Sequence, residues 1–66
     1  MILTVNGEDR ELPEALTLTA LLEQLSLSAT RVAVERNGDI VSRERFGDTV
    51  LESGDRLEVV HFVGGG

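Results

Sequence analysis

An α+β fold, in which one helix covers one face of a small mixed sheet, is predicted by three features of this 66-residue sequence. Alternating apolar residues near both ends of the chain are typical of strands. The dipeptides Asn6-Gly7 and Asn37-Gly38 indicate two-residue hairpins, because a type I′ turn needs positive φ at both central positions. Between the hairpins lies one segment of leucines with helical spacing. A lone helix can cover only one face of one sheet, which makes two layers.

The first hairpin is predicted over residues 2–12. Leu3 and Val5 share one face of the first strand, residues 2–5, and residues 8–12 form the returning strand. Pro13 ends the hairpin, because proline has no backbone N–H to donate to a strand ladder.

The helix is predicted from four leucines at positions i, i+3, i+4 and i+7, namely Leu18, Leu21, Leu22 and Leu25. Thr17 is the expected N-cap, although Ala20 at the third position after it forms no capping box. We expect the helix to end near Ser26 without a glycine cap.

A second, shorter hairpin follows the helix. Residues 31–36 are the predicted third strand, with Val32 and Val34 on one face, and residues 40–41 form the returning strand after Asn37-Gly38. The next segment, residues 42–49, is polar, and Phe46 is expected to fold back as its anchor.

The last strand is predicted over residues 56–63, after a turn at Ser53-Gly54-Asp55. The helical crossover should be right-handed and leave its flanking strands parallel. This arrangement is the β-grasp fold. We expect residues 1–63 to form one β-grasp domain and residues 64–66 to form a flexible glycine tail, since glycine has the widest backbone freedom.

The composition excludes several classes of function. Twelve acidic and six basic residues give a net charge of −6, which opposes binding to phosphate backbones and favours a partner with a basic face. There is no cysteine for a disulfide or thiolate metal site. We expect no secretory signal and no membrane span, and therefore a cytoplasmic protein.

No catalytic constellation is predicted, so we expect a protein that is not an enzyme and binds no metal or cofactor. The serines lie in predicted loops without a neighbouring base. The only histidine, His61, is expected to cap the edge of the core, because it alternates with Leu57 and Val59. The carboxylates, Asp55 and Glu58 among them, lack the spacing of a calcium loop and are interpreted as solvated.

An apolar pair is predicted on the sheet face away from the helix. If Leu57 and Val59 face the helix, the period of two turns Val60 and Phe62 outward, beside the glycine tail. An exposed apolar patch rimmed by charge is typical of a docking surface, so Val60 and Phe62 are candidate partner-binding residues.

Four segments resemble the sulfur carrier proteins of thiamine biosynthesis, the ThiS-like family of ubiquitin-like β-grasp proteins. They are the terminal HFVGGG at 61–66, GDRLEVV at 54–60, VERN at 34–37 and RERF at 43–46. The chain length and the order of the elements are also similar throughout.

The resemblance implies a chemical role for the glycines. A ubiquitin-activating-type adenylyltransferase would use ATP and magnesium to adenylate Gly66, which then becomes a thiocarboxylate with sulfur from a donor enzyme and passes that sulfur to thiazole synthase. Gly65 completes the terminal pair, and Gly64 is a third glycine beyond the minimal signature. The carrier is expected to be a monomer when free. Two alternatives remain: a carrier of the molybdopterin-synthase small-subunit type, and a non-catalytic β-grasp interaction module.

Overall fold

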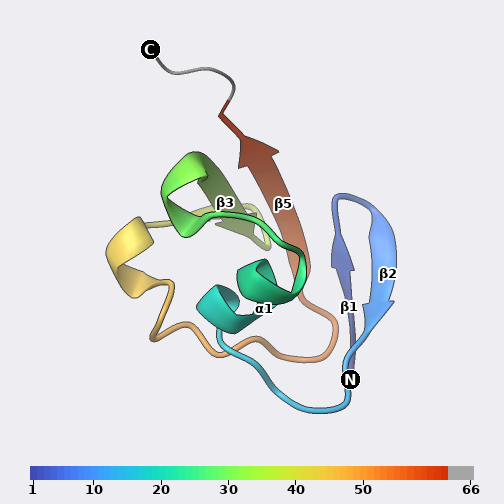
Figure 1. Ribbon diagram of the computed structural model, residues 1–66. Coiled ribbons are helices and arrows are strands. Elements are labelled where there is room, and N and C mark those ends of the chain that lie inside the picture. The colour runs from blue at the N-terminus through green and yellow to red at the C-terminus, as the bar shows by residue number, and fades with distance from the viewer. Residues whose placement is uncertain (63–66) are drawn as a thin grey trace.

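The computed structural model of the chain describes residues 1–62. Its five-stranded sheet has the strand order β2-β1-β5-β3-β4, and α1 (Leu18–Gln24) packs on one face of it (Figure 1). The predicted α+β fold is therefore confirmed. The glycine tail predicted at residues 64–66, and Val63 before it, lie outside the described residues.

The first hairpin forms as predicted from β1 (Ile2–Val5) and β2 (Glu8–Glu11), which pair antiparallel. Asn6 and Gly7 have φ values of 51° and 82°, as a type I′ turn requires. The side chains of β2 are all charged and exposed. Because β2 is an edge strand, these charges oppose pairing with another sheet.

Thr17 is the N-cap of α1, as predicted, and its hydroxyl accepts a hydrogen bond of 3.1 Å from the backbone N–H of Ala20. It buries three leucines, Leu18, Leu21 and Leu22, each at most 1% exposed. After its C-cap the chain reverses at Ser26, which has a φ of 59° although it is not glycine.

The second hairpin comprises β3 (Val32–Arg36) and β4 (Asp39–Val41). The predicted third strand began one residue too early, because Arg31 ends a short 3-10 helix, η1 (Ala29–Arg31). A second 3-10 helix, η2 (Arg43–Arg45), lies in the polar segment, residues 42–49, for which no element was predicted. It leads into Phe46, which is 3% exposed and confirms the predicted anchor.

The strand β5 (Arg56–His61) lies at the centre of the sheet, parallel to β1 and antiparallel to β3. The strands that flank the helix, β2 and β3, consequently run in the same direction, as the crossover rule predicts. Within the part of the chain that the structure describes, the buried hydrophobic residues other than Phe46 are aliphatic: Leu3, Val5, Leu12, Leu18, Leu21, Leu22, Val32, Val34, Leu51, Leu57 and Val59. Within residues 1–62, no helix is long and apolar enough to cross a membrane.

Candidate functional site

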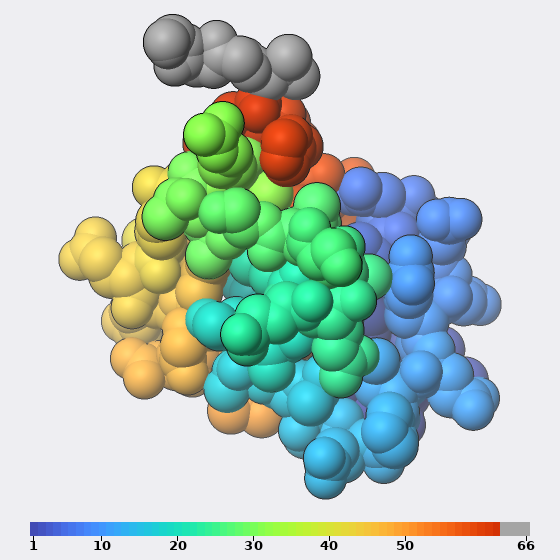
Figure 2. Space-filling view, viewed as in Figure 1, coloured from blue at the N-terminus to red at the C-terminus, as the bar shows by residue number. Residues whose placement is uncertain are grey.

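The central strand β5 leads directly to the predicted tail. It ends on the side of the molecule opposite the N-terminus (Figure 1). Figure 2 shows the last described residues at this end of the molecule. Val60 is 61% exposed and Phe62 is 47% exposed, which agrees with their predicted outward orientation. That these two residues bind a partner stays a prediction.

The face of the sheet away from α1, called the open face below, is apolar at its tail end. Strand register places Val60 opposite Ala33, which is also exposed. With Phe62, the next residue on the same face, they form an apolar patch. We define the apolar patch as Ala33, Val60 and Phe62.

The middle of the open face is acidic. Glu58 of β5 stands directly opposite Glu35 of β3, and like charges in this position repel each other. They line a shallow hollow between the two Asn-Gly turns. Of the described residues that line this hollow, Arg56 is the only cationic one. From β2, Asp9 adds a further carboxylate opposite Thr4. An apolar patch beside an acidic surface suits a partner whose docking face is apolar and basic.

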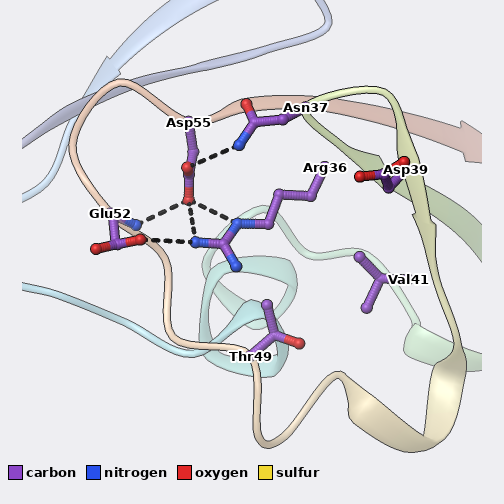
Figure 3. Close-up of a pocket in the computed structure, with 7 residues that line it drawn as sticks. All are labelled: Arg36, Asn37, Asp39, Val41, Thr49, Glu52 and Asp55. Carbon is purple, nitrogen blue, oxygen red and sulfur yellow. Dashed lines mark hydrogen bonds and ion pairs between the residues drawn. The ribbon is translucent and has the colours of Figure 1, made fainter.

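A buried carboxylate lies at the start of β5. Asp55 is 6% exposed, which corrects the prediction that its side chain is solvated. Its Oδ2 accepts hydrogen bonds of 2.9 Å from Arg36 Nε and 2.8 Å from the Glu52 backbone N–H, and Asn37 Nδ2 donates to its Oδ1 at 3.1 Å (Figure 3). Arg36 also forms ion pairs with Asp55 and Glu52.

These contacts determine the charge state of Asp55. Burial alone raises the pKa of this carboxyl, but the hydrogen bonds from Glu52, Asn37 and Arg36, together with the charge of Arg36, lower it further than burial raises it. The net result is a pKa below the ordinary value of 3.8. Because both carboxylate oxygens accept protein hydrogen bonds, Asp55 joins the β3–β4 turn to the start of β5.

The remaining candidate residues are the lone histidine and the terminal glycines. His61 lies beside Val59 and Leu25 at the edge of the core, as predicted, but its side chain is exposed. Among residues 1–62, no group of three potential ligands is arranged to hold a metal ion. Gly64, Gly65 and Gly66 lie outside the described residues.

Comparisons with known proteins agree on one family. The ThiS family profile matches residues 3–66. The sulfur carrier protein ThiS of Bacillus subtilis is 39% identical over 66 residues, which cover 98% of this chain and all of that protein. The crystal structure of a thiamine biosynthesis protein (ThiS) from Geobacter metallireducens is 42% identical, with a TM-score of 0.85 and full coverage of both chains.

The chain also matches a part of longer relatives. A thiazole synthase of Paramagnetospirillum magneticum is 42% identical over the whole of this chain, and one of Magnetococcus marinus is 46% identical. The chain spans only 20% of the length of each of these two proteins.

Proposed function

Since the chain belongs to the ThiS family, we propose that it carries sulfur for thiamine biosynthesis on its last residue, Gly66. The observation that supports this most strongly is the match to a sulfur carrier over the full length of both chains. In this role the chain is a protein co-substrate and not an enzyme. The two alternatives, a molybdopterin-synthase type of carrier and a non-catalytic module, lack such support.

The chemistry requires activation before sulfur transfer. A terminal carboxyl has a pKa of about 3.3–3.7, so Gly66 is an anion at neutral pH and resists nucleophilic attack. In the proposed first step a carboxylate oxygen attacks the α-phosphorus of ATP, and pyrophosphate leaves. A sulfur nucleophile then displaces AMP from the acyl adenylate and leaves a thiocarboxylate. Magnesium and the cationic groups for this chemistry come from the activating enzyme.

The glycines are proposed to enter a partner's active site, and the open face is proposed to dock to the partner. Gly64 and Gly65 have no side chains, so they suit a narrow channel that leads to a partner's active site. Docking is assigned to Val60 and Phe62 of the apolar patch, with the acidic middle of the open face attracting a basic surface.

The proposed partners are three proteins in the cytoplasm. A ubiquitin-activating-type adenylyltransferase activates Gly66, a sulfur-donating enzyme supplies the sulfur, and thiazole synthase receives it. The proposal of thiazole synthase as a partner is supported by the two thiazole synthases that align with this chain over part of their length. A carrier that is fused to its sulfur acceptor in one protein would serve the same reaction as a separate carrier. The free carrier is proposed to be a monomer.

Intact-mass spectrometry tests this function. Incubated with the activating enzyme, ATP, magnesium and sulfide, the chain is expected to gain the mass of one oxygen-to-sulfur exchange, located on Gly66. A variant without Gly65 and Gly66 should show no gain, yet melt like the wild type, since an unpacked terminus contributes little to stability. An unchanged wild-type mass, or equal modification of the truncated chain, would refute the proposal.

A further inference from the structure

The strand β5 loses one of its two neighbouring strands after its second residue, Leu57. Its parallel pairing with β1 ends at Val5 and Leu57, because the chain turns away at Asn6. On the other side β3 stays paired as far as His61, and the N–H of Phe62 still donates to the carbonyl of Arg31 at 2.7 Å. The half of β5 nearer the tail therefore has a strand on one side only.

The side chain of Asn6 occupies the place where β1 would have continued. Its Oδ1 accepts a hydrogen bond of 2.7 Å from the N–H of Val59, and its Nδ2 donates one of 3.1 Å to the carbonyl of the same residue. Its backbone N–H donates to the carbonyl of Leu57 at 2.8 Å. The carboxamide thus pairs with both polar backbone groups of Val59, as a further residue of β1 would do.

Position 6 requires a residue that tolerates a positive φ and that carries both a hydrogen-bond donor and an acceptor, and asparagine has both properties. Its φ of 51° lies in the left-handed region, which asparagine, aspartate and glycine tolerate best. The contact with Val59 requires one acceptor and one donor. Glycine has neither, and an ionised aspartate has no donor for the Val59 carbonyl.

We propose that Asn6 is a positioning residue for sulfur loading: by holding Val59, it sets the direction in which the chain leaves the sheet toward Gly66. This inference rests on the proposed function. Val59 is held by Asn6 on one side and by Val34 of β3 on the other, so without Asn6 this part of β5 is fastened on one side only. A misplacement of about 1 Å can cost a reaction about a hundredfold in rate.

The second Asn-Gly turn provides a matched control. Asn37 has a φ of 53°, its Oδ1 accepts from the N–H of Arg56 at 2.9 Å, and its Nδ2 donates to Asp55. It therefore fastens the same strand through the same chemical group. It does so at the end of β5 that is farther from the tail.

The test compares Asn6→Gly with Asn37→Gly in the full chain. Glycine adopts positive φ readily, so both variants keep their turns. In Asn6→Gly we expect the amide hydrogen exchange of Val59 to accelerate about tenfold, as the loss of about one net hydrogen bond predicts. When this variant is the substrate of the activating enzyme, with ATP, magnesium and sulfide, the kcat for thiocarboxylate formation should fall about tenfold. The KM for the variant should change less than about twofold, because the apolar patch is intact.

Asn37→Gly should lower the melting temperature at least as much as Asn6→Gly, since it also disturbs Asp55, yet leave kcat within about twofold of wild type. Equal losses of kcat in the two variants would show that Asn6 acts only through stability and would overturn the proposal, as would an unchanged kcat in Asn6→Gly. A wild-type chain that gains no sulfur would instead refute the proposed function, and the positioning role with it.

Discussion

The two faces of the sheet differ sharply in burial although the same strands build both. Along β5, Leu57 is 1% exposed and Val59 is 9% exposed, whereas Val60 on the open face is 61% exposed. Successive side chains of a strand point to opposite faces, so one strand serves both the core and the surface. Substitutions at neighbouring positions of β5 should consequently separate stability from recognition.

The largest effect is expected for the helix that covers the buried face. Leu21 and Leu22 are each 1% exposed, and replacing a core leucine by alanine costs about 2–5 kcal/mol. A domain of this size gains only about 3–5 kcal/mol from its core. Leu21→Ala or Leu22→Ala should therefore be largely unfolded at physiological temperature when followed by circular dichroism. Cooperative melting near that of wild type in both variants would contradict the importance assigned to this face.

An intermediate effect is expected at Asp55, which lies at the start of β5. Asp55→Ala should cost about 1–3 kcal/mol, because Arg36 and Asn37 lose their shared acceptor. Since the folded state lowers the pKa of Asp55, its contribution is complete above the ordinary value of 3.8 and is lost as the pH falls through the lower folded value.

This contribution is measured by urea unfolding of wild type and Asp55→Ala at several pH values, as the difference between their free energies of unfolding. The gap between the two proteins should be constant near neutral pH and narrow below pH 3.8. A gap that stays constant through the acid range would mean that Asp55 stabilises the fold without its charge.

The smallest effect on stability is expected on the open face, where the effect on binding should be large. Phe62→Asp should change the free energy of unfolding by only about 0.5 kcal/mol, because the side chain is 47% exposed and lies outside the core. In a titration with the activating enzyme it should bind more weakly than wild type, since it places a charge in the apolar patch. Val50→Asp is the matched control, because Val50 is 54% exposed but lies outside the five strands. Equal binding of wild type and Phe62→Asp would remove Phe62 from the docking surface.

Features with a local cause could be predicted from the sequence. The two Asn-Gly turns, the Thr17 cap and the leucine spacing each determine structure within a few residues. The outward orientation of Val60 and Phe62 followed from the period of a strand.

Features that depend on strand register could not be predicted in this way. Asp55 and Arg36 are 19 residues apart and meet only because β3 pairs with β5. The contact between Asn6 and Val59 spans 53 residues and depends on where β1 stops pairing with β5. The sequence predicts that α1 ends near Ser26, but it does not predict the positive φ of that residue, because no glycine marks the position.

The contrast between Phe46 and Phe62 has a spectroscopic consequence. The sequence contains no tryptophan and no tyrosine, and these two phenylalanines are its only aromatic residues. One is 3% exposed in the core and the other is 47% exposed beside the tail. Labelling with fluorophenylalanine would therefore place one fluorine reporter in each environment. In ¹⁹F NMR spectra of one sample, the Phe46 resonance would report unfolding and the Phe62 resonance would report binding of a partner.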